Sequence, residues 1–149
     1  MKILFICHGN ICRSTMAEFV LKDMVAKQGL DWEIASAATS REELGNDIHP
    51  GTKAKLREVG IPFERRQARQ ITQKDYEYYD MLIGMDARNI INMRRFYGDD
   101  PQNKFSLLLD HSDRPHDIAD PWYTGNFDTT YADIKEGCEA LIKKIGEQK

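Results

Sequence analysis

The sequence has few of the features that mark several large classes of protein. Only three of its 149 residues are cysteines, and an odd number of thiols argues against a secreted disulfide framework. Its apolar runs are far too short to span a bilayer. The net charge of −3 provides no basic surface for a nucleic acid or an anionic membrane. Repeats and low-complexity tracts are also absent, so we expect one globular domain over residues 1–149.

The N-terminus offers no targeting signal either. Met1 leads directly into an apolar run, which leaves no room for the charged and apolar regions of a signal peptide. A reducing compartment also suits a chain whose cysteines are not arranged as a disulfide framework. We therefore expect a cytoplasmic protein.

Apolar runs and amphipathic segments alternate along the chain, which is typical of a parallel sheet connected by helices. The predicted fold class is α/β, a doubly wound four-stranded parallel sheet with helices on both faces. The expected strands cover 2–7, 32–37, 79–85 and 105–109, and the expected helices cover 13–28, 51–59, 73–77, 86–97 and 128–147. Thr72 and Asp86 are the expected N-caps of two of these helices. Polar loops fill 38–50 and 110–126.

The first strand is followed at once by Cys7-His8-Gly9-Asn10-Ile11-Cys12-Arg13-Ser14. Ligands of such sheets bind beyond the carboxyl ends of the strands, and a helix that begins there directs its free N–H groups at an anion. Gly9 and Asn10 tolerate the positive φ angles of a closed anion cradle. The sequence therefore predicts a phosphate loop after strand one, with Cys7 at its floor.

The residue types at the two ends of this loop suit attack on a phosphate monoester. Arg13 offers a planar fork of donors for two phosphate oxygens, and the positive field favours the thiolate form of Cys7. The Ser14 hydroxyl can donate to the sulfur and stabilise it as a leaving group, so the nucleophile needs no adjacent histidine base. A Cys-x5-Arg pattern alone occurs by chance, but the strand, Gly-Asn, serine and helix around it favour a functional loop.

The segment CHGNICRS resembles the phosphate-binding loop of the low-molecular-weight protein tyrosine phosphatases. Further segments resemble that family in the same order along the chain: residues 36–40, 68–72, 85–86 and 120–123. The resemblance implies hydrolysis of phosphotyrosine and aryl phosphate monoesters through a phosphocysteine intermediate, without metal or cofactor, on phosphotyrosine-containing protein substrates. Two positions depart from the family pattern. Thr15 stands where proline is usual, and Glu42 lies near a position that is often aromatic.

Asp120 is the predicted proton donor for the leaving group. Pro121 forces it into an extended conformation and hence a loop, and Trp122 and Tyr123 follow directly. On residue type alone an aspartate before proline is more often a turn former. The resemblance reverses that balance, and it implies that the same carboxylate later activates the attacking water. Neighbouring aspartates at 110, 113 and 117 lack the run of proline and two aromatics.

The predicted catalytic residues are thus Cys7, Arg13 and Asp120. The substrate-binding set is expected to be His8, Gly9, Asn10, Ile11, Cys12, Ser14, Trp122 and Tyr123. His8 is interpreted as a cleft-lining residue and not as a base. Cys12 either forms a reversible disulfide with Cys7 or packs beneath the loop, and the resemblance allows both.

Other residues were assigned structural roles. Ser36 resembles the family serine that supports Asn10, although a local strand-end hydroxyl explains it equally well. Cys138 is expected in the core. The basic cluster of Arg65, Arg66 and Arg69 is interpreted as a solvated face. The spacing of the histidines matches no metal site.

Rival functions remain open. A phosphoarginine phosphatase of the same fold would, by resemblance, carry threonine where this chain has Ile11. An arsenate reductase on this scaffold needs relay cysteines that are missing here. A phosphocysteine carrier must protect its phosphoryl group from water, which Asp120 would defeat. We expect no nucleic-acid or membrane partner, and a monomer or weak dimer.

Overall fold

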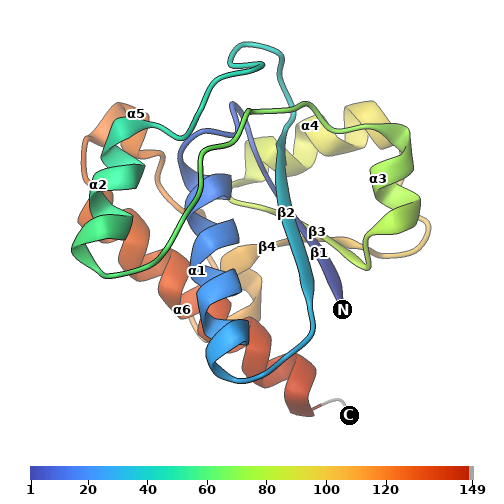
Figure 1. Cartoon of the computed structure of the whole chain (residues 1–149). Coiled ribbons are helices and arrows are strands. Elements are labelled where there is room, and N and C mark those ends of the chain that lie inside the picture. Colours follow the sequence, from blue (N-terminus) through green and yellow to red (C-terminus); the bar gives the residue numbers. More distant parts are fainter. Residues whose placement is uncertain (148–149) are drawn as a thin grey trace.

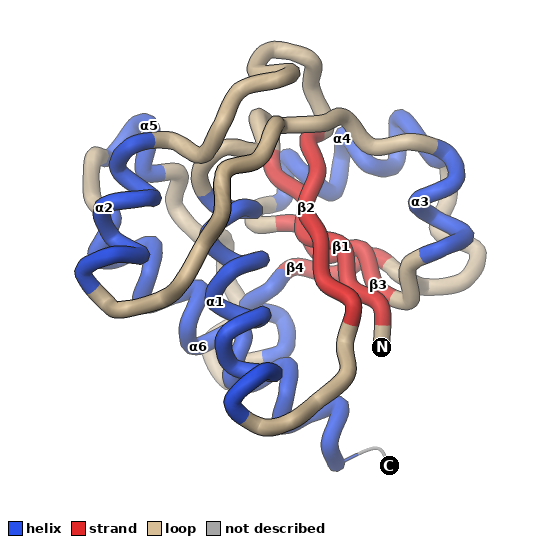
Figure 2. The backbone as a smooth tube through the Cα atoms, in the orientation of Figure 1, coloured by secondary structure: helices blue, strands red, loops and turns tan. Residues whose placement is uncertain are grey.

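A parallel sheet of four strands forms the centre of the molecule. The computed structural model describes residues 1–147, so positions 148–149 of the predicted domain lie outside the described residues. The strands are β1 (Lys2–Cys7), β2 (Glu33–Ala38), β3 (Met81–Gly84) and β4 (Phe105–Leu107). They lie side by side in the order β2-β1-β3-β4, and every pair is parallel (Figure 2). The predicted fold class is confirmed.

Strand β1 is buried on both faces, as a central parallel strand must be. Its side chains alternate between two apolar clusters because successive residues of a strand point to opposite faces. Ile3 and Phe5 join the cluster that also contains residues of α1 and α6, whereas Leu4 and Ile6 join Leu82 in the cluster on the other face. Because helices cover both clusters, the carboxyl end of β1 is held firmly where the predicted loop begins.

Helices lie on both sides of the sheet (Figure 1). Helices α1, α2 and α6 group on one side, and α3 and α4 lie on the other. Asp86 caps α4 by accepting a hydrogen bond from the backbone N–H of Asn89 at 2.9 Å, as its sequence position predicts. The helices are α1 (Arg13–Lys27), α2 (Pro50–Glu58), α3 (Gln73–Tyr78), α4 (Ala87–Tyr97), α5 (Pro121–Thr124) and α6 (Phe127–Glu147), with a 3₁₀ turn η1 (Leu108–His111).

Two predicted segments need correction, and the other boundaries differ by one or two residues. The strand expected over 105–109 ends at Leu107, because the Asp110 carboxylate accepts the Leu107 N–H at 2.9 Å and starts the 3₁₀ turn. The loop expected over 110–126 contains the short helix α5, which begins directly after Asp120. Cys138 is fully buried, as predicted, and burial raises the pKa of its thiol. Among the helices of residues 1–147, none is long and apolar enough to cross a membrane.

Candidate active site

The loop from His8 to Cys12, called the phosphate loop below, turns the chain from β1 into α1. Asn10 has a φ of 60°, which asparagine tolerates better than most residues. Gly9 does not share this positive φ, contrary to expectation. Glycine lets the Glu43 side chain approach closely at this position, because a Cβ at Gly9 would lie 3.2 Å from Cγ of Glu43.

The phosphate loop carries backbone donors that have no protein acceptor among residues 1–147. Within the part of the chain that the structure describes, the backbone amides of Gly9, Ile11 and Cys12 donate to no protein acceptor. No side chain caps the amino end of α1. Thr15, which replaces the proline usual in the resembled family, donates its hydroxyl to the Cys12 carbonyl at 2.9 Å and leaves these amides unpaired. Such an arrangement of N–H groups at a helix N-terminus favours an anion.

Cys7 lies at the base of the phosphate loop, where its thiol is contacted by one residue of the loop and one residue of the first turn of α1. The Asn10 amide donates to Sγ at 3.3 Å, and the Ser14 Oγ lies 3.0 Å from Sγ. The side-chain amide of Asn10 donates to the same Ser14 oxygen at 2.8 Å. Because that oxygen already accepts a hydrogen bond from Asn10, its own proton can be directed at a sulfur anion.

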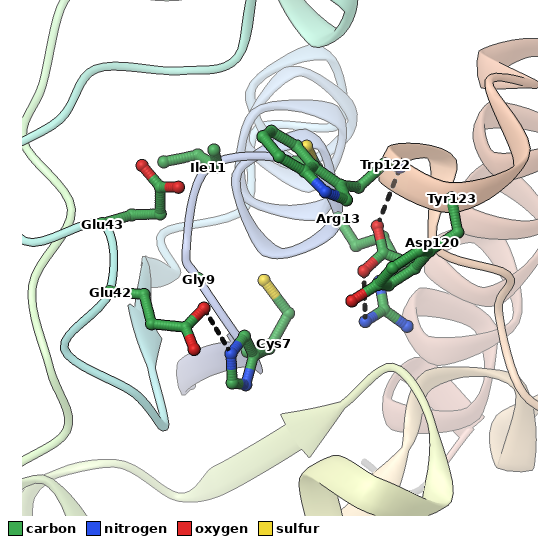
Figure 3. Close-up of a pocket in the computed structure, with 11 residues that line it drawn as sticks. Cys7, Gly9, Ile11, Arg13, Glu42, Glu43, Asp120, Trp122 and Tyr123 are labelled. Atoms are coloured by element: carbon green, nitrogen blue, oxygen red, sulfur yellow. Dashed lines mark hydrogen bonds and ion pairs between the residues drawn. The ribbon is translucent and has the colours of Figure 1, made fainter.

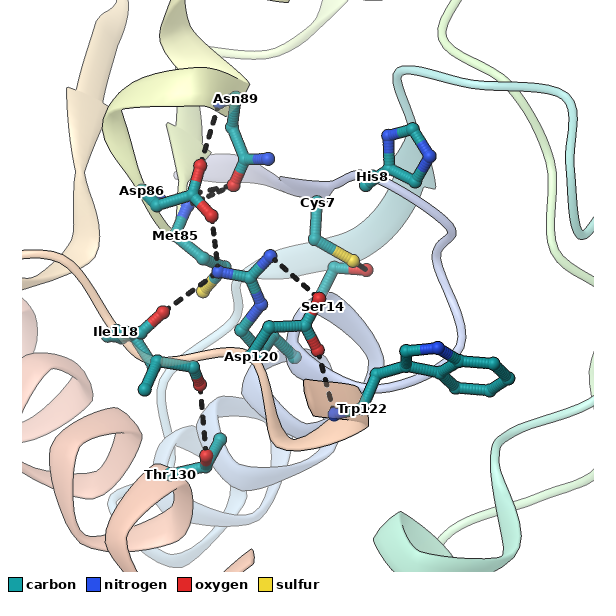
Figure 4. A network of polar contacts seen from close by, with 12 residues as sticks. Cys7, His8, Ser14, Met85, Asp86, Asn89, Ile118, Asp120, Trp122 and Thr130 are labelled. Carbon is teal, nitrogen blue, oxygen red and sulfur yellow. Dashed lines mark hydrogen bonds and ion pairs between the residues drawn. The ribbon is translucent and has the colours of Figure 1, made fainter. Parts of the chain in front are cut away.

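Arg13 is held rigidly at the other end of the loop. Its NH1 donates to Asp86 Oδ2 at 2.7 Å and to the carbonyl of Ile118 at 2.8 Å (Figure 4). Its NH2 lies 3.5 Å from Asp120 Oδ2. Burial alone would lower the pKa of Arg13, but the nearby Cys7 and the carboxylates of Asp86 and Asp120 raise it above its usual value. The guanidinium is therefore a permanent, preoriented positive charge.

Asp120 faces Cys7 from the far side of the pocket (Figure 3). It is the N-cap of α5, and its Oδ1 accepts the Trp122 N–H at 3.0 Å. Its other oxygen is the one near Arg13. The preceding carbonyl, that of Ala119, accepts a hydrogen bond from the Thr130 hydroxyl at 3.1 Å, which ties the segment to α6.

One pocket gathers most of the predicted site residues. Asn10 and Ser14 are exceptions, because both residues are fully buried and contact Cys7 instead of lining the pocket. Glu42 and Glu43, which were not in the predicted set, form one wall, and Trp122 and Tyr123 stand opposite (Figure 3). The pocket is lined by Cys7, His8, Gly9, Ile11, Cys12, Arg13, Glu42, Glu43, Asp120, Trp122 and Tyr123.

Residues 2–149 match the family model described as low molecular weight phosphotyrosine protein phosphatase. The chain belongs to this family. It is 40% identical over 153 residues to the low molecular weight protein-tyrosine-phosphatase YfkJ of Bacillus subtilis, covering 100% of this chain and 98% of that protein. It is 34% identical to the human low molecular weight phosphotyrosine protein phosphatase, covering 95% and 94% of the two chains.

Solved structures agree with this membership of the low-molecular-weight phosphatases. The crystal structure of Bacillus subtilis YfkJ superposes with a TM-score of 0.96 at 40% identity, covering 100% of this chain and 96% of that one. A Drosophila arginine phosphatase superposes with a TM-score of 0.88 at 30% identity, covering 97% and 98%. The fold is therefore shared by proteins whose names give different substrates.

Arg66 is the main site residue that the sequence did not reveal. It was interpreted as part of a solvated face, but its guanidinium is partly buried and supports the phosphate loop. NH1 donates to the Asn10 carbonyl at 2.7 Å, and NH2 bonds the Asn10 side-chain oxygen. Burial lowers the pKa of Arg66, and the charges of Glu18, Cys7 and Asp47 partly offset that effect.

Ser36, which resembles the family serine that supports Asn10, has no direct contact with Asn10. Its hydroxyl donates to the buried Glu18 at 2.5 Å and lies 3.3 Å from NH2 of Arg66. Ser36 therefore acts on Asn10 through Arg66. Arg65 is exposed, as the solvated-face interpretation expects, and Arg69 pairs with Asp75 at 2.9 Å.

Two residues after β3 also escaped assignment. Asp86 holds Arg13, and Asn89 holds Asp86 by accepting the Asp86 N–H at 3.1 Å and the Met85 N–H at 2.8 Å. The sequence position of Asp86 predicts the N-cap of α4, but its part in the site is indicated only by the family resemblance of the pair Met85-Asp86. Its contact with Arg13 joins positions 73 residues apart, so no local spacing could reveal it.

Cys12 is buried and unpaired in the structure. Burial, and next the neighbouring Cys7, raise the pKa of the Cys12 thiol to about 12. Cys12 is therefore a neutral thiol at physiological pH, and it is not itself a nucleophile in this state. A disulfide between the two cysteines stays a prediction.

Proposed function

We propose that this chain is a protein tyrosine phosphatase that hydrolyses phosphotyrosine and aryl phosphate monoesters. Family membership supports the activity, and the placement of Cys7 beneath the amides of the phosphate loop, opposite Asp120, carries the mechanism. The catalytic residues proposed are Cys7, Arg13 and Asp120.

In the first step, the Cys7 thiolate attacks phosphorus in line, so the S–P bond forms as the bond from phosphorus to the aryl oxygen breaks. The phosphate loop amides and the Arg13 fork bind the equatorial oxygens, where negative charge spreads in the transition state. Asp120, in its protonated form, gives its proton to the departing oxygen. The products of this step are a phenol and phosphocysteine.

In the second step, water attacks the phosphocysteine and the sulfur leaves. Asp120, now a carboxylate, takes a proton from that water as it attacks. Ser14 donates a hydrogen bond to the departing thiolate and keeps its proton, and the hydrogen bond that its oxygen accepts from the Asn10 side chain orients it for this. Inorganic phosphate is released and Asp120 is protonated again, so the cycle balances without a metal or cofactor.

The proposed substrates are phosphotyrosine-containing proteins, with no nucleic-acid or membrane partner. The aromatic side chains of Trp122 and Tyr123 are 57% and 85% exposed at the pocket mouth, which suits stacking on a phenyl ring. A free thiol nucleophile also suits the cytoplasm as the proposed location. We further propose a single domain, acting as a monomer or weak dimer.

Phosphoarginine is the second candidate substrate, because a Drosophila arginine phosphatase shares the fold at 30% identity. Ile11 lines the pocket and is 8% exposed. Its branched apolar side chain offers no hydrogen bond to a guanidinium, whereas it packs well against an aromatic ring. This observation favours phosphotyrosine.

The test measures phosphate release from matched phosphotyrosyl and phosphoarginyl peptides by reduced, EDTA-treated protein. Wild-type turnover of phosphotyrosine, none by Cys7→Ser, and a loss of about 10²- to 10³-fold in Asp120→Ala are expected. Equal turnover by wild type and Cys7→Ser would exclude Cys7 as the nucleophile. Faster turnover of phosphoarginine would reassign the substrate, and an accumulating phosphoenzyme without phosphate release would favour a carrier.

A further inference from the structure

His49 connects the phosphate loop to the segment that carries Asp120. It precedes α2 as its N-cap, and its ring Nδ1 accepts the Gly51 N–H at 3.0 Å. Its own backbone N–H donates to the carbonyl of Ile11 at 2.9 Å. The backbone of His49 is therefore fixed to the phosphate loop, and the cap fixes the orientation of its ring.

The ring of His49 packs on the aromatic side chains of Trp122 in α5 and of Phe127, the first residue of α6. It meets the Trp122 ring edge to face, with centroids 5.5 Å apart and an interplanar angle of 74°. It stacks on Phe127 at 5.6 Å and 21°. The contact is close enough to require glycine at position 51, because a Cβ there would lie 2.2 Å from Cζ of Phe127.

These contacts continue directly to the Asp120 carboxylate. The Trp122 backbone N–H donates to Asp120 Oδ1 at 3.0 Å (Figure 4). Helix α5 has only four residues, and so short a helix is not stable on its own. Its orientation must come from packing. Trp122 is 57% exposed, and its ring contacts the ring of His49, so His49 contributes to the packing that orients α5.

We propose that His49 is a positioning residue that sets where Asp120 stands relative to Cys7. The inference rests on the proposed function, because it gives Asp120 the role of proton donor. His49 does not touch substrate. It acts through Trp122, and its loss lets α5 sample orientations in which the carboxylate is too far from the leaving oxygen.

Two substitutions separate the ring of His49 from its capping role. His49→Asn keeps a side-chain acceptor that suits an N-cap and removes the ring. His49→Phe keeps an aromatic ring and removes the acceptor. Both keep the backbone N–H that bonds Ile11. Thermal unfolding of both variants establishes that each is folded before its kinetics are compared.

The readout is kcat/KM over a series of aryl phosphates whose phenols differ in acidity. A poor leaving group needs the proton from Asp120, whereas a good one departs with little help. We expect His49→Asn to lower kcat/KM by about 3- to 10-fold for phosphotyrosine, the size of one aromatic contact, and by less than about 2-fold for p-nitrophenyl phosphate. His49→Phe should keep the wild-type dependence on the leaving group.

Asp120→Ala in the same series separates the two proposals. If it shows no steeper dependence on the leaving group than wild type, the proposed role of Asp120 fails. Suppose instead that kcat/KM depends more steeply on leaving-group acidity in Asp120→Ala than in wild type, while His49→Asn shows the wild-type dependence. The inference about His49 is then overturned and the proposed function stands. Should His49→Asn not fold, His49→Ser, which also retains a capping oxygen, decides by the same criterion.

Discussion

Replacing Arg66 with methionine tests how the phosphate loop is held. Methionine keeps much of the aliphatic stem and removes the guanidinium, which donates to the carbonyl of Asn10 at 2.7 Å and to its side chain. Asn10 in turn contacts both Cys7 and Ser14. The substitution therefore removes support from the loop without altering any group that touches substrate.

The expected cost follows from those two bonds. A hydrogen bond from a charged donor contributes roughly 1.5–3 kcal/mol net, and desolvation of the guanidinium offsets part of the sum. We expect the free energy of unfolding of Arg66→Met to fall by about 2–3 kcal/mol. A loop misplaced by a fraction of an ångström should also lower kcat/KM about 10- to 100-fold.

Urea unfolding followed by circular dichroism gives the first quantity, and turnover of an aryl phosphate gives the second. Arg65→Met is the matched control, because Arg65 is the exposed neighbour of the same residue type. An exposed site should change stability by less than about 0.5 kcal/mol. If Arg66→Met behaved like Arg65→Met in both assays, the support that we assign to Arg66 would be wrong.

Two further predictions concern charge. Partial burial would raise the pKa of Asp47, but hydrogen bonds from Lys53 and from the Arg66 amide outweigh it and lower the pKa to about 2. Because the unfolded value is about 3.9, this stabilisation is complete above about pH 5 and is lost as pH falls toward the folded value of about 2. Urea unfolding of Asp47→Asn should therefore show a cost of about 1–2 kcal/mol at neutral pH that shrinks over this range, and a cost independent of pH would contradict the shift. Glu42 lies in the pocket wall with its side chain 69% exposed and its Oε2 2.8 Å from Nε2 of His8. Replacing this negative charge with a positive one should favour peptides with acidic flanks. We expect Glu42→Lys to raise the ratio of kcat/KM for acidic-flanked over basic-flanked phosphotyrosyl peptides about 3- to 5-fold. That gain should weaken in high salt. If the ratio of kcat/KM for acidic-flanked to basic-flanked peptides were the same in wild type and Glu42→Lys, the prediction would be wrong.

Contiguous signals made the first part of the site predictable. The apolar run of β1, the Gly9-Asn10 pair and the amphipathic start of α1 follow one another, so each supports the next. Residues 3–6 are indeed fully buried. The extended backbone of Asp120 could also be predicted from its immediate neighbour, because the proline after it restricts its conformation.

Contacts between distant positions could not be predicted in this way. Arg66 and Asn10 lie 56 residues apart, and nothing around an arginine in a basic cluster distinguishes a buried guanidinium from a solvated one. The end of β4 was missed for a different reason. Leu107 and Leu108 are equally apolar, and only the Asp110 side chain, which caps the turn, determines where the strand ends.

The unpaired amides of Gly9, Ile11 and Cys12 have a thermodynamic consequence for the whole molecule. Native protein carries this donor cradle, whereas the unfolded chain does not, so an oxyanion that binds it stabilises the folded state by mass action. An oxyanion present at 100 times its dissociation constant raises the free energy of unfolding by about 2.7 kcal/mol. The melting temperature should thus rise as the phosphate concentration increases and the site fills. Since phosphate is also the released product, the same cradle that gives the protein its affinity for substrate makes it subject to inhibition by its own product.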